Sequence, residues 1–293
     1  MVSYAAPTAR VSVTSRSRRV NTPSEGGSSS CPSRNSTGVP LSPHLWAGSD
    51  LPPLLSEDGP FGWVPDAYDT FVARLLGTDP AYPCSFGVTG QQRGNNSFSA
   101  VDTRHPGTHG VKALADSLHA YRERAWRGPK RQSLVVFVGP AEPGRSLADD
   151  HGRFWELLAE LSTYDTEPWP NDVPRDPSDP DWQWCFASEP WFVFAASPAH
   201  RARRSRDLGP CLTLVFQVRR VFDGIGGSTV AGKAAKRRVR EGLRKYDLTD
   251  VHPSLGDGEH STDFKWRQYA LQDDGATPAA GACPYPYGER PHP

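Results

Sequence analysis

The sequence predicts an α+β fold, a single domain in which helices flank a central sheet that is mixed or antiparallel. Two observations support this prediction. Segments with helical spacing and short apolar runs occur along the chain without strict alternation, which disfavours a purely parallel α/β sheet. No internal repeat is visible, and 293 residues with nine Trp and twelve Phe suffice for one large core.

The first half of the predicted domain contains two helices around one buried strand. Residues 111–125 repeat apolar side chains at helical spacing. Residues 133–138 (SLVVFV) form a continuous apolar run, closed by Gly139-Pro140, as is typical of a buried strand. Residues 147–161 have apolar side chains on one helical face, so we expect a second amphipathic helix there.

The second half begins with a proline-rich loop, residues 165–181, that holds six acidic residues and one Arg. The remaining predicted elements are strands at 182–186, 191–195 and 211–217, a turn at Ser188-Glu189-Pro190, and a basic helix at 233–245.

Two terminal segments differ from the central region of residues 46–274. Residues 1–45 contain eleven Ser and five Arg but one acidic residue, so we expect a disordered extension without a function. Such a start is also typical of a transit peptide, whereas a secretory signal would need an apolar segment that is missing. Residues 275–293 contain five prolines and are expected to form a loose tail.

The composition indicates a soluble protein of the reducing cytoplasm. The formal net charge is zero, so no overall bias favours nucleic acid or an acidic membrane. The five cysteines include no CxxC pair, which argues against a disulfide framework or a zinc site. No apolar run approaches the ~18 residues of a membrane helix, so we expect no membrane partner.

Several familiar catalytic signatures are incomplete. Residues 227–234 (GSTVAGKA) approach a phosphate-binding P-loop, but Ala234 stands where a Ser or Thr should bind magnesium. No His is followed two residues later by Asp or Glu, which removes the usual mark of a two-histidine, one-carboxylate iron site. His105 and His109 are four residues apart, but the Pro and Gly between them favour a loop.

A series of short motifs occurs in order along the central region. They are Tyr82-Pro83-Cys84-Ser85-Phe86-Gly87, Phe154-Trp155-Glu156-Leu157-Leu158, Asp165, Trp169-Pro170, Asp179-Pro180-Asp181-Trp182, Cys185-Phe186, Glu189-Pro190, Pro198-Ala199-His200, Arg204-Ser205-Arg206, Val221-Phe222-Asp223, Arg240, Tyr246-Asp247 and Gln268-Tyr269. Together, over residues 60–273, they resemble the YqcI/YcgG family. Gln217-Val218-Arg219 departs from the family, since many relatives have a proline before the arginine.

The resemblance implies a function. Characterised members of the family are haem proteins that hydroxylate a guanidine nitrogen, which implies b-type haem, dioxygen or hydrogen peroxide as the oxidant, and a guanidino substrate. The expected reaction converts L-arginine to N-omega-hydroxy-L-arginine in antibiotic or other secondary metabolism. Because the sequence has no flavin or nicotinamide fingerprint, a separate reductase is expected to donate electrons.

The haem iron would need a protein ligand with a lone pair, and the only Met is Met1. His200 is the first candidate, since it follows a predicted strand and precedes several arginines. The alternatives are His151 and Cys84. Arg204, Arg206 and Arg219 are the candidates for binding haem propionates. A purely structural role is the other interpretation of each potential ligand.

A guanidinium group is cationic and planar, so a carboxylate should hold it near the iron. Asp165 and Glu189 are the candidates, because both lie near a Trp in the family-like motifs. For the acidic loop, ordinary solvated turns are the alternative. Residues 201–245 hold thirteen Lys or Arg and three acids, so a nucleic-acid-binding module is a competing function, as is a haem-binding sensor or carrier without turnover. The resemblance favours the hydroxylase and no nucleic-acid partner.

Overall fold

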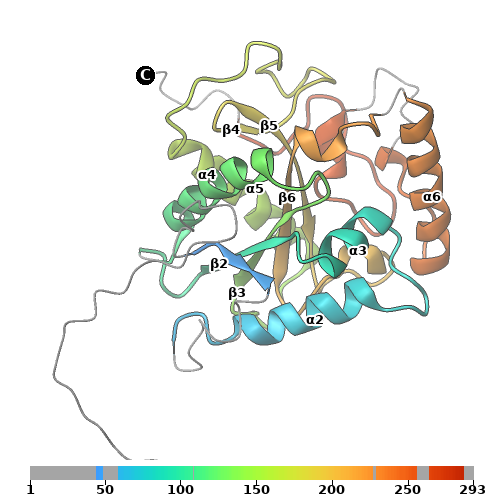
Figure 1. Ribbon diagram of the computed structural model, residues 1–293, viewed down its shortest axis with the longest axis horizontal. Helices are drawn as coiled ribbons and strands as arrows, with labels where there is room; N and C mark the ends of the chain where they lie inside the picture. Colours follow the sequence, from blue (N-terminus) through green and yellow to red (C-terminus); the bar gives the residue numbers. More distant parts are fainter. Residues whose placement is uncertain (1–43, 49–58, 108, 227–228, 256–263, 287–293) are drawn as a thin grey trace, which may run out of the picture. The chain divides into compact units, whose positions relative to one another are not determined.

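A six-stranded mixed sheet forms the centre of the computed structural model (Figure 1). In spatial order its strands are β1 (Trp46–Ala47), β2 (Ser97–Asp102), β3 (Leu134–Gly139), β6 (Leu212–Val218), β5 (Glu189–Ala196) and β4 (Cys185–Phe186). Strands β2 and β3 are parallel, and every other neighbouring pair is antiparallel. The predicted α+β class with a mixed sheet is therefore confirmed.

The structure describes residues 44–48, 59–107, 109–226, 229–255 and 264–286, which belong to one unit of residues 33–293. Almost all of the predicted extension at residues 1–45, two residues of the near P-loop, and the end of the predicted tail lie outside the described residues. Within the described part, no helix combines the length and apolar character needed to cross a bilayer.

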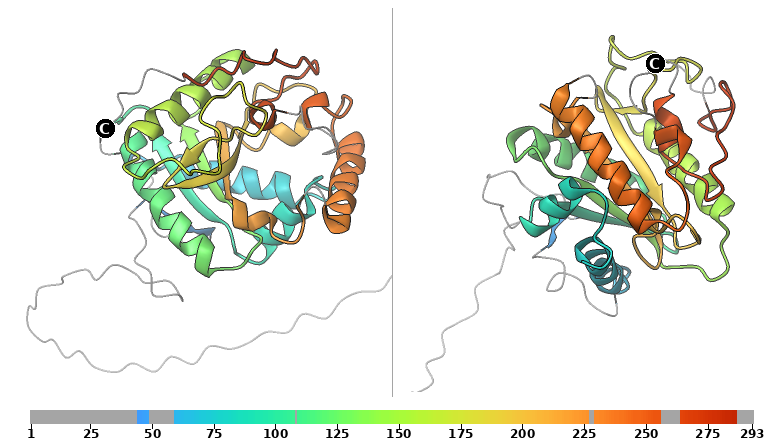
Figure 2. Two further views of the ribbon diagram at one scale, coloured as in Figure 1. Left: turned by 90° about the horizontal axis from the view of Figure 1, so that it is seen from above. Right: turned by 90° about the vertical axis from the view of Figure 1, so that its right-hand side faces the viewer.

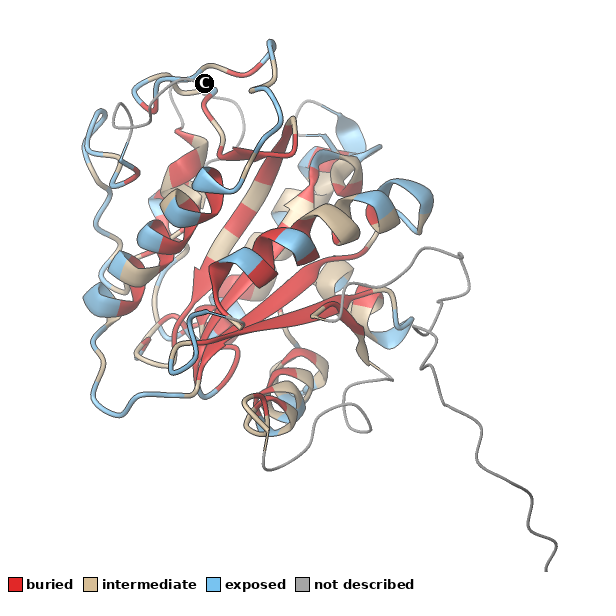
Figure 3. Ribbon diagram, turned by 90° about the vertical axis from the view of Figure 1, so that its left-hand side faces the viewer, coloured by how far each residue is buried: buried red, intermediate tan, exposed pale blue. Residues whose placement is uncertain are grey.

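Side chains alternate between the two faces of the sheet, and each face carries its own core. On β3, Val136 points into the larger core and Phe137 into the smaller one. Helices α4 (Val111–Arg127) and α5 (Leu147–Thr163) cover the first face, and helix α2 (Val64–Leu76) covers part of the second. Figure 3 shows that the buried residues of these helices lie on the sides that face the sheet.

Two more helices stand over the second face. Helix α3 (Ser85–Gln92) follows the segment Tyr82-Pro83-Cys84. Helix α6 (Val230–Tyr246) begins at Thr229, whose hydroxyl accepts the N–H of Gly232. Figure 2 shows α6 on the opposite side of the sheet from α4 and α5.

The predicted helices are all present and slightly longer than expected. Helix α5 is fixed at its start by a capping box, in which Ser146 and Asp149 each bind the other's backbone N–H. The sequence did not indicate α3 or β2, because polar and glycine residues interrupt their apolar patterns. Helix α2 was not predicted either, although its buried residues Val64, Ala67, Phe71 and Leu75 recur at helical spacing. Strand β2 reads SFSAVD, yet all six of its residues are buried.

The predicted strand at 182–186 is shorter in the structure, where only Cys185–Phe186 pairs with β5. Ala187 and Ser188 have left-handed backbone conformations, with φ of 53° and 55°, and turn the chain directly into β5 at Glu189. The turn therefore lies one residue earlier than predicted.

Part of the proline-rich C-terminal segment packs on the larger core. The Tyr285 side chain is buried, its ring lies 5.4 Å from that of Trp182, and its hydroxyl is 2.7 Å from the Ser162 hydroxyl on α5. Residues 275–286 thus end on the surface that α5 presents.

We expect Tyr285→Ala to lower the free energy of unfolding by about 3 kcal/mol, because it removes a buried aromatic ring and leaves a cavity. Tyr285→Phe keeps the ring and should cost only about 1 kcal/mol, the value of one hydrogen bond. Urea unfolding of the two variants measures both. Equal stability of Tyr285→Ala and the unmodified chain would show that the segment does not pack as described.

Candidate functional site

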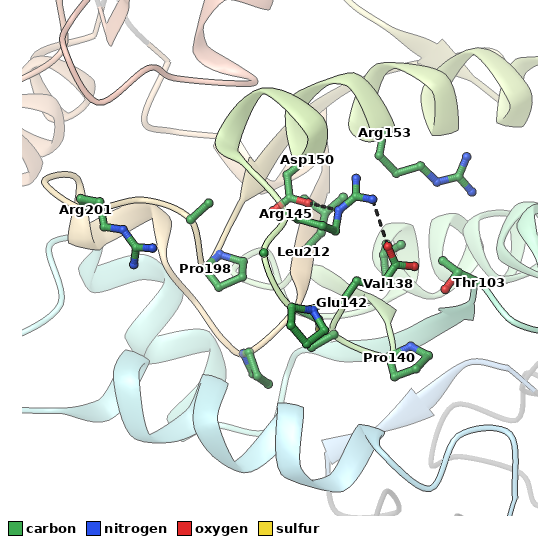
Figure 4. Close-up of a pocket in the computed structure, with 16 residues that line it drawn as sticks. Thr103, Val138, Pro140, Glu142, Arg145, Asp150, Arg153, Pro198, Arg201 and Leu212 are labelled. Atoms are coloured by element: carbon green, nitrogen blue, oxygen red, sulfur yellow. Dashed lines mark hydrogen bonds and ion pairs between the residues drawn. The ribbon is translucent and has the colours of Figure 1, made fainter.

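Two cavities formed by described residues differ in their chemistry. The first, of about 510 Å³, lies where β3 and β5 end and β6 and α5 begin (Figure 4). Its charged groups are largely paired: Arg145 lies between Asp150, at 2.7 Å, and Glu142, at 3.3 Å. We call it the polar cavity because of these pairs; its lining also includes apolar residues such as Val138, Pro140 and Leu212, but none of the described residues that line it is aromatic.

The second cavity, of about 290 Å³, lies between α6 and the second face of the sheet, and we call it the α6 cavity. Its walls are mainly apolar: Phe71 and Leu75 of α2, Phe86 of α3, Val135, Phe192, Phe194 and Val215 of the sheet, Phe222, and Val239 and Leu243 of α6. Lys236 and Arg240 of α6 also line it, as do the amides Asn96, Gln217 and Gln268. Among the described residues that line this cavity, none carries a carboxylate. Apolar walls with a few polar groups are typical of small-molecule sites.

Cys84 lines the α6 cavity and is the N-cap residue of α3. Burial raises the pKa of its thiol, and the backbone N–H groups of Gly87 and Phe86 offset part of that rise. Because these two N–H groups point at the sulfur, they would also stabilise a thiolate bound to a metal ion.

The segment that carries Cys84 is held from two sides. The Tyr82 hydroxyl donates to the Ser205 carbonyl at 3.1 Å, and the Tyr82 ring packs edge-on against Tyr246 of α6. On the other side α6 approaches closely, because a Cβ placed on Gly242 would lie 3.0 Å from the Cα of Pro83. Glycine at position 242 therefore sets the distance between α6 and the Cys84 segment.

A buried polar cluster lies behind this segment. Asp247 accepts the backbone N–H and the hydroxyl of Ser205, at 2.7 and 2.9 Å, and Arg203 lies 3.8 Å away. The Arg206 guanidinium stacks on Phe194 at 4.2 Å and donates to the Gln268 carbonyl. Burial lowers the pKa of Arg206 to about 10. Arg206, a predicted propionate ligand, does not itself line the α6 cavity. It contacts Phe194 and Gln268, which do.

His200, the first ligand candidate, is buried and bound to Asp273, whose carboxylate oxygen lies 2.8 Å from Nδ1. Because a carboxylate only accepts, the proton is on Nδ1 and Nε2 keeps its lone pair. That Nε2 has no hydrogen-bond partner among the described residues. His151 lies next to it, with ring centres 6.0 Å apart. Neither histidine lines the polar cavity or the α6 cavity.

The other predicted propionate ligands are separate. Arg204 stacks on Tyr246 at 5.4 Å, where it helps to hold the end of α6. Arg219 is exposed and pairs with Asp172 at 3.1 Å. The structure therefore brings Cys84, Arg204 and Arg206 into one neighbourhood and leaves Arg219 outside it.

The two predicted substrate acids lie at the β4–β5 turn. Asp165 accepts the backbone N–H groups of Ala187 and Glu167, at 3.0 and 3.1 Å, and so supports the left-handed turn. Glu189 accepts the indole N–H of Trp126 at 2.6 Å. Neither lines the α6 cavity. Within the described residues no group of three or more His, Cys, Asp or Glu side chains is placed to bind a metal, although a haem iron needs only one protein ligand.

Sequence reasoning missed the cavity-facing side of α6. Lys236, Val239, Arg240 and Leu243 recur at helical spacing and line the cavity together. The sequence therefore does contain a signal for a cavity-facing side of this helix. It is difficult to recognise because two of the four residues are charged and the segment is rich in Lys and Arg. Gln217 was noted as a departure from the family and also lines the cavity.

Comparisons with known proteins agree with the positions of these motifs. The model of the YqcI/YcgG family matches residues 70–286. The chain is 34% identical over 237 residues to the uncharacterized protein YqcI of Bacillus subtilis (strain 168), covering 78% of this chain and 90% of that protein. It is 35% identical over 236 residues to YcgG of the same organism, covering 77% and 88%.

A third relative has a printed name that states a reaction. It is the "Putative N(omega)-hydroxy-L-arginine synthase DcsA" of Streptomyces lavendulae, 32% identical over 231 residues, covering 77% of this chain and 85% of that protein. No solved structure matches the chain significantly.

Gly242→Ala should push α6 away from the Cys84 segment, because its Cβ would meet the Pro83 backbone. Gly152→Ala on α5 is the matched control, since nothing lies within 4 Å of a Cβ there. The control should gain about 0.5–1 kcal/mol of stability from helix propensity, and Gly242→Ala should lose that gain or become less stable. Urea unfolding compares the two, and an equal gain in both would refute the close approach.

Acid should destabilise the fold before its carboxylates titrate. Burial lowers the pKa of His151 and of His252 from 6.5 to about 4, so the unfolded chain binds protons at pH 5 that the native chain does not. The free energy of unfolding should therefore fall as pH drops from 6.5 to 4, with His151 contributing about 2 kcal/mol of that fall between pH 7 and 5. Urea unfolding of His151→Gln should show a smaller fall; the same pH dependence in both proteins would contradict this assignment.

Proposed function

The chain belongs to the YqcI/YcgG family, and on that premise we propose that it is a haem-dependent N-hydroxylase of a guanidino substrate, with L-arginine as the first candidate. The observation that carries the proposal is Cys84 in the wall of an apolar cavity with two cations beside it. The printed name of the 32%-identical relative supports the same reaction class. Within the described residues, Cys84, Cys185, Cys211 and Cys283 form no disulfide, which is in line with the reducing cytoplasm as the proposed location.

The residues of the α6 cavity fit a b-type haem. A cysteine thiolate is an accepted axial ligand, and Cys84 is the residue lining the cavity that we assign to this role. The phenyl rings of Phe86, Phe192 and Phe194 offer the apolar contact that a porphyrin needs. Lys236 and Arg240 on α6 are suited to bind its two propionates, so they take the place that Arg204 and Arg219 were expected to fill.

Haem, when bound, supplies an iron that activates dioxygen or peroxide for insertion of oxygen into an N–H bond. The protein's own contribution is to exclude water and to orient the substrate. The aromatic walls exclude water. The Gln217 amide N–H donates to the Ser133 hydroxyl at 2.8 Å, which fixes the amide and leaves its carbonyl oxygen to accept an N–H of the guanidine.

The assignment of the axial ligand has a direct test. With hemin added, we expect Cys84→Ala to lose the Soret band of the bound haem or to shift it, and His200→Ala to retain it. The ferrous carbon monoxide complex of the unmodified protein should show the strong red shift typical of thiolate ligation. Because His200→Ala removes the partner of Asp273, its folding must be checked by circular dichroism.

A second measurement tests the substrate. L-Arginine should shift the Soret band of the unmodified protein, and Gln217→Ala should weaken that response with the haem retained. Haem loss in His200→Ala but not in Cys84→Ala would transfer the ligand role to His200. A Soret band that ignores every guanidine would favour a haem carrier or sensor over an enzyme.

A further inference from the structure

The outer face of α6 is strongly cationic. The helix contains seven Lys or Arg and one acidic residue, Glu241. Two of the cations, Lys236 and Arg240, line the α6 cavity from its inner side. The other five are exposed: Lys233, Arg237, Arg238, Arg244 and Lys245.

The exposed cations share one side of the helix. Positions 233, 237, 241 and 244 are three or four residues apart, and 238 and 245 flank them, so they form one stripe of five cations and one acid, Glu241. Four of these cations make no ion pair with another described residue: Arg237, Arg238, Arg244 and Lys245. On α4 and α5, by contrast, charged side chains form ion pairs within their own helix. A net positive charge concentrated on a single face raises the local potential and steers an oppositely charged partner.

The position of this stripe decides what kind of partner fits. The same helix forms the wall of the α6 cavity, and an α-helix with its side chains is about 10–12 Å across. A protein docked on the stripe is therefore separated from the cavity by one helix, a distance over which electrons can tunnel. A nucleic acid would gain the same charge attraction, but nothing about that ligand would require the stripe to back onto a cavity.

We propose that the exposed face of α6 is the docking surface for an acidic one-electron carrier protein, which reduces the iron bound in the α6 cavity. This inference rests on the proposed function. The electron count closes: two electrons from the carrier, two protons and one dioxygen convert one N–H to N–OH and one water. Each encounter would oxidise the carrier by one electron, so one turnover would need two encounters, of which the first would reduce ferric iron to ferrous.

A charge-reversal pair tests the surface. In Arg237→Glu/Arg238→Glu both changes lie on the exposed stripe, and neither residue lines the cavity. The matched control is Lys112→Glu/Arg127→Glu on α4, which alters the net charge equally but lies over the other face of the sheet. The probe is a purified acidic [2Fe–2S] ferredoxin, and its dissociation constant is measured at low and high salt with and without hemin.

We expect the α6 pair to weaken ferredoxin binding at low salt by about tenfold or more, a change of about 1.4 kcal/mol. The control pair should change it less than about threefold, and high salt should weaken binding to the unmodified protein. With haem bound, the rate at which reduced ferredoxin converts the ferric Soret band to the ferrous one should fall in parallel. Arg237→Gln/Arg238→Gln, which removes the charges without reversing them, should give an intermediate loss.

The remaining outcomes are equally decisive. Equal ferredoxin binding by the α6 and control pairs overturns the docking surface, even if the protein carries haem. Binding of a short duplex DNA that the α6 pair abolishes, with no ferredoxin binding, overturns it in favour of a nucleic-acid partner. Failure of hemin to bind overturns the proposed function instead, and is seen in the spectrum independently of ferredoxin affinity.

Discussion

The Asp247 carboxylate joins three segments that are far apart in the sequence, and the shape of the α6 cavity depends on it. It follows Tyr246 at the end of α6, and it binds the backbone and the hydroxyl of Ser205. Ser205 in turn accepts the Tyr82 hydroxyl, two residues before Cys84. A buried carboxylate is costly unless it is hydrogen-bonded and its charge is offset. Ser205 provides the hydrogen bonds, and the neighbouring guanidinium groups offset the charge. The end of α6, the Ser205 segment and the Tyr82 segment therefore stabilise one another.

The sheet separates stability from the site. On β5, Trp191 and Val193 point into the larger core and are fully buried, whereas Phe192 and Phe194 point the other way, are only partly buried, and line the α6 cavity. One strand thus anchors the fold on one face and forms the cavity floor on the other. An apolar surface left open in this way opposes folding and is typical of a surface that binds a ligand. The other face of β5, which packs against the core beneath α4 and α5, stabilises the strand despite this exposed apolar surface.

The sequence predicted what depends on local periodicity and composition. It indicated the fold class and the helices that became α4, α5 and α6, because their spacing and charge patterns are continuous. It did not indicate α3 or β2, whose burial comes from contacts across the sheet, and it left unused the helical spacing of Val64, Ala67, Phe71 and Leu75 in α2. For the site, Cys84, Arg204 and Arg206 were identified as candidates, and the structure places them near one another. Asp165 and Glu189 were selected because of neighbouring aromatic residues, but the partners that occupy them, Ala187 and Trp126, are 22 and 63 residues away. Periodicity carries no information on such contacts.

The lack of a carboxylate among the described lining residues has a chemical consequence for the proposed reaction. A carboxylate in this cavity would be attracted by Lys236 and Arg240, and burial would otherwise raise its pKa, so it would be a poor fixed partner for a guanidinium. A side-chain amide carries no charge and is not neutralised by those cations. Gln217, held by Ser133, can direct an N–H through geometry alone. Selection among guanidines would then depend on the shape of the aromatic walls and on one directed hydrogen bond, and a change at position 217 would alter which nitrogen reacts without altering the charge of the site.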